Sequence, residues 1–134
     1  MLSLSMTCTL NAAGNKFLML LEGRGACYIQ DRGVSRWDTC AGEAILRAHG
    51  GIFFKLSSIA TSGTFENYLY KPTQVNLDIE EISSVGGEST LIPSYTNICG
   101  LFALSPIVAE NEELINGYCR GIARVAKTCK PKFV

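Results

Sequence analysis

The chain has 134 residues, of which 47% are hydrophobic and 18% are charged. This length and composition predict one globular domain with a buried core, and they exclude a disordered or fibrous chain. Twelve basic and twelve acidic residues cancel, so no net field would draw the chain to nucleic acid or to an anionic membrane.

Neither a membrane span nor a secretory signal is expected. The longest apolar run, residues 17–21, is far shorter than the roughly 20 residues of a spanning helix, and residues 1–10 lack a basic region before an apolar core. We therefore expect a cytoplasmic protein. The six cysteines are irregularly spaced, without a CxxC pair, and there is only one histidine, which argues against a zinc site and favours free thiols.

The first predicted elements are a helix and a strand. Residues 11–22 begin with Asn11, which could cap a helix, and continue with good helix formers up to a pair of nearby glycines. A buried strand over residues 17–21 is an alternative that periodicity leaves open. Residues 25–30 contain an aromatic and a β-branched residue before a turn, which predicts a short inner strand.

The strongest helix signal covers residues 37–49, which are followed by Gly50 and Gly51 as a stop. Its apolar residues recur at spacings of three and four: Trp37, Ala41, Ala44, Ile45 and Ala48. We expect Trp37 to be a core anchor that fixes the direction in which the chain enters this helix. Residues 51–56 then predict a strand that leaves the glycine pair.

The second half of the chain is less regular. Residues 57–96 are rich in Ser, Thr, Gly and Pro, and predict a long excursion with one or two edge strands. Residues 98–104 predict a buried strand, and Pro106 opens a final helix that reaches about residue 126. This order of elements predicts an α/β fold in which helices bury the strands.

Three polar residues are candidates for binding. Asp38 lies in the first turn of a predicted helix, where its carboxylate could cap the helix, the commoner role, or hold a hard cation. Thr39 adds a hydroxyl at the same helix start, which could cap the helix or receive phosphate. Lys16 follows a turn of small residues, where it could meet a phosphate or be a solvated surface residue. His49 has no partner at a metal or triad spacing and is interpreted as structural.

Two segments resemble a known family. Residues 37–51, WDTCAGEAILRAHGG, closely resemble the second signature of the inositol monophosphatase superfamily, in which Trp-Asp opens a helix that ends in Gly-Gly. Residues 12–16, AAGNK, with the following Leu-Leu-Glu-Gly, resemble the segment that precedes this signature. Residues 97–105 and 106–129 are similar to the family's last strand and closing helix, whereas residues 57–96 are only loosely comparable.

This resemblance implies a fold and an activity. The fold would be the C-terminal α/β sandwich subdomain of the inositol monophosphatase-type sugar phosphatases. The activity would be that of a lithium-sensitive phosphomonoesterase, in which carboxylates hold Mg2+ ions that activate water. Asp38 would be a metal ligand. Lys16, with the backbone from Ala12 to Gly14, would contact the remote phosphate or hydroxyls of a small phosphorylated substrate, and Thr39 would add a contact at the second helix start.

The chain also departs from the family's pattern. The first half of such enzymes supplies most metal ligands through a Gly-Asp…Glu segment and an Asp-Pro-Φ-Asp-Gly-Thr signature, and neither occurs here. The other aspartates, Asp31 and Asp78, lie in no such motif. One carboxylate cannot confine Mg2+. We therefore expect residues 1–134 to form a C-terminal subdomain that lacks its N-terminal metal-binding half and is inactive alone.

Three functions remain open. The leading one is the inositol polyphosphate 1-phosphatase branch, acting on inositol 1,4-bisphosphate, which is favoured by Arg47 in AILRA and by the small residues before Lys16. The 3'(2'),5'-bisphosphate nucleotidase branch, acting on adenosine 3',5'-bisphosphate, is favoured by the sequences Thr-Cys-Ala and Gly-Asn-Lys. The third alternative is a silent remnant or binding module. The surface that a missing half would cover should then be apolar, and the chain should tend to self-associate.

Overall fold

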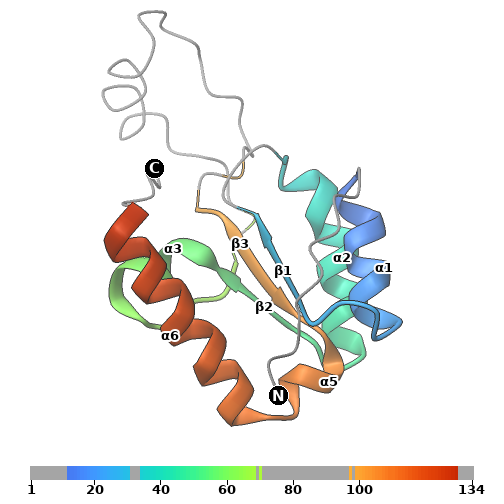
Figure 1. Ribbon diagram of the computed structural model, residues 1–134. Coiled ribbons are helices and arrows are strands. Elements are labelled where there is room, and N and C mark those ends of the chain that lie inside the picture. The colour runs from blue at the N-terminus through green and yellow to red at the C-terminus, as the bar shows by residue number, and fades with distance from the viewer. Residues whose placement is uncertain (1–11, 31–33, 69, 71–96, 98, 130–134) are drawn as a thin grey trace, which may run out of the picture.

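The computed structural model describes residues 12–30, 34–68, 70, 97 and 99–129 (Figure 1). These residues form a three-stranded antiparallel sheet made of β1 (Cys27–Gln30), β2 (Ile52–Lys55) and β3 (Leu101–Leu104). The strand order is β1-β3-β2, so the last strand along the chain lies at the centre. Helices pack on the sheet, which agrees with the predicted α/β class.

The helices lie in two pairs on the two faces of the sheet (Figure 1). On one face, α1 (Ala13–Leu21) packs against α2 (Trp37–Ala48). On the other, α3 (Leu56–Ser62) packs against α6 (Glu112–Cys129), which follows the short helix α5 (Pro106–Ala109). In the part of the chain that the structure describes, no helix is both long enough and apolar enough to span a bilayer.

Strand β3 separates two hydrophobic cores. All four of its residues are buried, and because successive side chains of a strand point to opposite faces, they are shared between the cores. Leu101 and Ala103 belong to the core beneath α1 and α2, whereas Phe102 and Leu104 belong to the core beneath α3 and α6. This double coverage explains why β3 is an uninterrupted apolar run.

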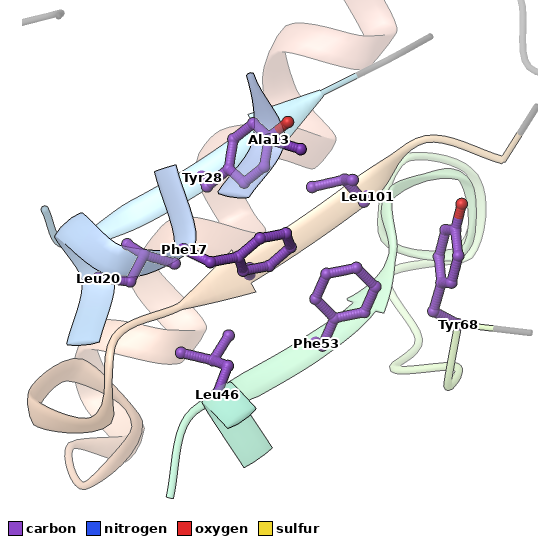
Figure 2. Packing of buried hydrophobic residues seen from close by; sticks show 9 residues of the cluster. Ala13, Phe17, Leu20, Tyr28, Leu46, Phe53, Tyr68 and Leu101 are labelled. Carbon is purple, nitrogen blue, oxygen red and sulfur yellow. The ribbon is translucent and has the colours of Figure 1, made fainter. Parts of the chain in front are cut away.

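The core beneath α1 and α2 is built on aromatic rings. Figure 2 shows the Phe17 side chain of α1 directed at the sheet, where its ring centroid lies 5.5 Å from that of Tyr28 and 5.7 Å from that of Phe53. The two helices approach closely at Gly42, since a side chain there would overlap the Phe17 ring. The small residue is therefore needed for α1 and α2 to pack.

Several predicted elements are confirmed, and four predictions are wrong. The predicted helix over residues 37–49 is α2, and the strand predicted over residues 51–56 is β2. The strand predicted over residues 25–30 is β1, Cys27–Gln30, and it lies at the edge of the described sheet, not inside it, because β3 inserts between β1 and β2. Asn11, proposed as a helix cap, and residues 71–96 of the predicted excursion lie outside the described residues.

The predicted excursion over residues 57–96 begins instead with helix α3. Three hydroxyl side chains of this helix donate to carbonyl oxygens in the preceding turn, Ser58 to Lys55, Thr61 to Ser57 and Ser62 to Ser58, at 2.8–3.0 Å. Their polar groups are thus satisfied within the helix, and the buried side chains of Leu56 and Ile59 fasten it to the sheet. Tertiary packing overrides the weak helix propensity of this sequence.

The predicted helix from Pro106 to about residue 126 is interrupted. Ser105 caps α5 by accepting a hydrogen bond from the Val108 amide at 3.3 Å. Asn111 then begins a new helix, because its Oδ1 accepts from the Leu114 amide at 3.1 Å. A second capping residue inside the apolar pattern therefore splits it into α5 and α6.

Helix α2 buries a different face from the one predicted. Trp37, expected to be a core anchor, is 66% exposed, and Ile45 is also exposed. The buried residues are Thr39, Glu43 and Leu46. The apolar spacing therefore identified a helix correctly but identified its inner face wrongly, since polar side chains with hydrogen-bond partners lie inward in place of the tryptophan.

Candidate functional site

The start of α1 has no capping side chain among the described residues. Ala12 precedes it with a φ of 69°, in the left-handed region that alanine rarely adopts, and no side chain caps the helix. Ala12 and Gly14 are exposed, and a side chain at Gly14 would meet nothing within 4 Å. Among the described residues no side chain caps the first turn of α1, and an uncapped helix start is an arrangement that can receive an anion.

Lys16 connects this helix start to strand β1. Its Nζ donates to Gln30 Oε1 at 3.3 Å and lies 4.8 Å from the centroid of the Tyr28 ring. The Tyr28 hydroxyl donates to the same Gln30 oxygen at 3.1 Å. The ammonium group is thus half-buried beside an aromatic face and an amide, which restricts its position more than solvent would.

Asp38 lies near this cluster. The pKa of Tyr28 is raised, first because its phenol is buried and second because the negative charge of Asp38 acts on it. Tyr28 and Gln30 were not among the residues predicted from sequence. Their alternation along β1 places both on the face covered by α1, and this is the signal that could have identified them.

The Asp38 carboxylate is exposed and takes part in capping α2. Its Oδ2 accepts from the Ser35 amide at 2.9 Å, while Ser35 Oγ accepts from the Trp37 amide at 3.2 Å. This reciprocal pair resembles a capping box, so the capping role considered from sequence is present. Only one carboxylate oxygen is used by these contacts, and the other accepts no hydrogen bond from the described residues.

The described residues do not fit a complete Mg2+ site. Within residues 12–30, 34–68, 70, 97 and 99–129, no three His, Cys, Asp or Glu side chains gather as a metal site would require. Asp38 could therefore provide one oxygen ligand, whereas Mg2+ takes six ligands in near-octahedral geometry.

Thr39 lies differently from the site residue that we expected. Its side chain is fully buried, and its Oγ1 donates to the Arg36 carbonyl at 2.9 Å and lies 3.4 Å from the Tyr70 hydroxyl. The hydroxyl thus faces the protein interior, whereas Asp38 beside it is exposed. This position favours a supporting role for Thr39 over direct contact with a ligand.

A buried polar network continues along α2 from Thr39. Glu43 accepts from the Tyr70 hydroxyl at 2.5 Å and from Arg47 Nε at 2.6 Å. Burial, followed by the hydrogen bond to the Glu43 carboxylate, raises the pKa of Tyr70 far above its ordinary value. Tyr70 therefore remains a neutral donor that fastens its segment to α2.

Arg47 extends this network to the sheet. Its Nη2 donates to the Phe53 carbonyl of β2 at 2.6 Å and to Asn67 Oδ1 at 3.2 Å. A parallel contact joins the Tyr68 hydroxyl to Asn97 Oδ1 at 2.9 Å. The network thus holds the chain after α3 against the helix that carries Asp38, and the Tyr68 contact adds Asn97, four residues before β3.

Comparison with known proteins identifies the family. Residues 3–80 match the Inositol monophosphatase family, and they include α1, β1, α2, β2 and α3. The chain belongs to this family. The matched segment thus contains the candidate binding residues Lys16 and Asp38.

Individual relatives match similar lengths. The chain is 39% identical over 80 residues to 3'(2'),5'-bisphosphate nucleotidase 1 of Homo sapiens, covering 59% of the chain and 22% of that protein. The Rattus norvegicus protein of the same name is 36% identical over 75 residues, covering 55% and 20%. An uncharacterized protein in the pss 5' region of Rhizobium leguminosarum bv. phaseoli is 35% identical over 71 residues, covering 53% and 70%. The match therefore spans about a fifth of each mammalian nucleotidase.

Proposed function

We propose that the chain is part of a Mg2+-dependent phosphomonoesterase, in which it holds the phosphorylated substrate and contributes one metal ligand. The observation that carries this proposal is the arrangement at one side of the sheet. The uncapped start of α1, as the described residues show it, and the Lys16 ammonium lie beside Tyr28, on which the charge of Asp38 acts. The family to which the chain belongs supports the same reaction class.

The residues divide into two roles under this proposal. Lys16 and the amides near Ala12 and Gly14 hold a phosphate that is not cleaved, since a cation and a helix start both favour an anion. The amide of Gln30 can bond to substrate hydroxyls after Lys16 turns to the phosphate. Asp38 would offer its second carboxylate oxygen as one ligand of Mg2+, which would supply Lewis-acid activation of water.

The metal site needs further ligands from outside the described residues. Since Asp38 is one carboxylate, we propose that another polypeptide segment completes the Mg2+ site and that this chain alone does not turn substrate over. The short span of the match to the nucleotidases agrees with a division of the site between segments. A silent binding module is the alternative.

The nucleotide is the substrate class that we favour. Arg47 and the small residues before Lys16 favoured inositol polyphosphates, but the Arg47 guanidinium is occupied by Glu43, the Phe53 carbonyl and Asn67. A side chain held in this way is not available to a substrate phosphate. The relatives carry the name 3'(2'),5'-bisphosphate nucleotidase. We therefore place adenosine 3',5'-bisphosphate first and inositol 1,4-bisphosphate second.

Titration calorimetry on the full chain tests the substrate proposal. Adenosine 3',5'-bisphosphate should bind more tightly than inositol 1,4-bisphosphate, and Lys16→Ala should weaken binding by about tenfold, the equivalent of one charge-assisted hydrogen bond. Lys127→Ala is the matched control, because this exposed lysine lies at the end of α6. Equal binding by Lys16→Ala and wild type, or no binding of either ligand, would overturn the assignment.

Phosphate release measured with Mg2+ tests the incomplete metal site. We expect no turnover of either substrate by the chain alone. Turnover that disappears in Asp38→Asn would mean that the chain completes a metal site itself, and the proposed division between segments would be wrong. Asp38→Asn keeps the size of the side chain and an oxygen acceptor for the Ser35 amide, so a loss of activity would not arise from a lost cap.

A further inference from the structure

An apolar groove lies on the side of the sheet away from Lys16 and Asp38. It has a volume of about 900 Å3 and runs between the edge strand β1, helix α3 and helix α6. Its lining includes Ile29, Leu114 and Val125, which are 47%, 47% and 56% exposed. Large apolar side chains gathered on one surface are typical of an interaction site.

Two glycines leave the backbone of α6 open along this groove. Gly117 and Gly121 lie one turn apart and both line the groove. A side chain at either position would meet nothing within 4 Å, so packing among the described residues does not require glycine there. Glycine inside a helix lowers its stability but lets another backbone approach closely. The two glycines therefore fit a helix packed against α6.

The charges on the rim are placed symmetrically about the glycines. Glu113 and Arg120 both line the groove and lie two turns apart, with Gly117 near their midpoint. Neither forms an ion pair with a described residue. If a second α6 packs antiparallel across a two-fold axis near Gly117, each Glu113 lies opposite the Arg120 of the other chain. One surface is then its own complement, as a two-fold interface requires.

We propose that this groove binds a second copy of the chain through antiparallel packing of the two α6 helices. The glycines allow the helix backbones to meet, Leu114 packs beside them, and two Glu113–Arg120 pairs fix the register. The dimer leaves the opposite side of the sheet, with Lys16, open. It is independent of the proposed phosphatase function.

Charge reversal tests the pairing on the full chain. Analytical ultracentrifugation over a wide concentration range should show a monomer–dimer equilibrium for the wild type. Glu113→Arg and Arg120→Glu should each raise the dimer dissociation constant by about tenfold or more, because each places two like-charged pairs on the rim. The double variant should return to within about threefold of the wild type. An equimolar mixture of the single variants should form heterodimers.

Two matched controls separate the surface from general effects. Glu112→Arg and Arg124→Glu reverse exposed charges on α6 that do not line the groove, so they should leave the dissociation constant within about twofold. Gly117→Gln should abolish the dimer while raising the thermal midpoint of the monomer, since glutamine is a better helix former. A folded, more stable monomer would distinguish blocked packing from misfolding.

Three results would overturn the proposal. The first is a chain that stays monomeric at every concentration, in which case the groove belongs to another polypeptide. The second is a dimer that neither Gly117→Gln nor charge reversal weakens, which would place the interface elsewhere. The third is association without fixed stoichiometry that the charge variants do not alter, which would show a non-specific apolar surface.

Discussion

The two faces of the sheet are stabilised in different ways. Beneath α1 and α2, an aromatic core is bordered by a network of directional hydrogen bonds that includes Glu43, Arg47 and Tyr70. Beneath α3 and α6, the described residues pack in an apolar cluster, and a groove lies beside it. Directional bonds fix the position of side chains, whereas apolar burial is non-directional. The face with the network is the one that carries the candidate site.

The largest expected effect is on the core of that face. Phe53 is fully buried and its ring packs against those of Phe17 and Tyr68. Phe53→Ala should lower the free energy of unfolding by about 3–5 kcal/mol, since it removes a buried ring and leaves a cavity. Urea unfolding followed by circular dichroism measures this loss. Phe65→Ala, at a ring that is partly exposed, is the control, and an equal loss in both variants would contradict the assigned core.

The next effect concerns the polar network itself. Glu43→Ala should destabilise the chain by roughly 2–3 kcal/mol, because it removes charge-assisted hydrogen bonds and leaves the Tyr70 hydroxyl and part of Arg47 without their partner. The same urea titration measures it. Glu110→Ala, at an exposed carboxylate, should change little. A loss below about 0.5 kcal/mol in Glu43→Ala would mean that the network adds no stability to this face.

The free energy of unfolding should also fall at high pH, because Tyr68 on this face is buried. Burial raises the pKa of Tyr68 from 10.0 to about 12, with the nearby Arg36 acting in the opposite direction. The folded state therefore holds this proton more tightly than the unfolded state. The contribution of the Tyr68 proton to the free energy of unfolding is fully present below pH 10 and is lost as the pH rises toward 12. Between pH 10 and 11, wild type should lose about 1 kcal/mol more than Tyr68→Phe, and equal losses in unfolding titrations would contradict this origin.

Much of the fold can be predicted from local sequence. The helix from Trp37 and the strand that follows Gly51 are encoded by periodicity and glycine stops, and both are confirmed. The short helix α3 is not recognisable locally, because its Ser and Thr residues gain their helical state from packing and backbone bonds. A local sequence pattern thus predicts whether a segment is a helix or a strand better than it predicts which tertiary contacts stabilise that segment.

The candidate site was less accessible to sequence reasoning. The motifs made Lys16 and Asp38 candidates, but the inner face of α2 depends on Tyr70, which lies 27 positions from its partner Glu43. A polar residue is favourable inside only when such a partner is present, and an isolated helix pattern does not contain that information. Gln30 could not be predicted for the same reason, because its contact with Lys16 joins strand β1 to helix α1.

The smallest effect should come from the groove and would sharpen the contrast between the faces. Leu114→Gln replaces a large apolar side chain that is about half exposed on α6. In dilute solution, where the chain is monomeric, it should change the free energy of unfolding by less than about 0.5 kcal/mol, because the side chain completes no core. At high concentration the same change should weaken association. A loss near that of Phe53→Ala in the monomer would show that the groove side is a closed core, and the distinction between the two faces would fail.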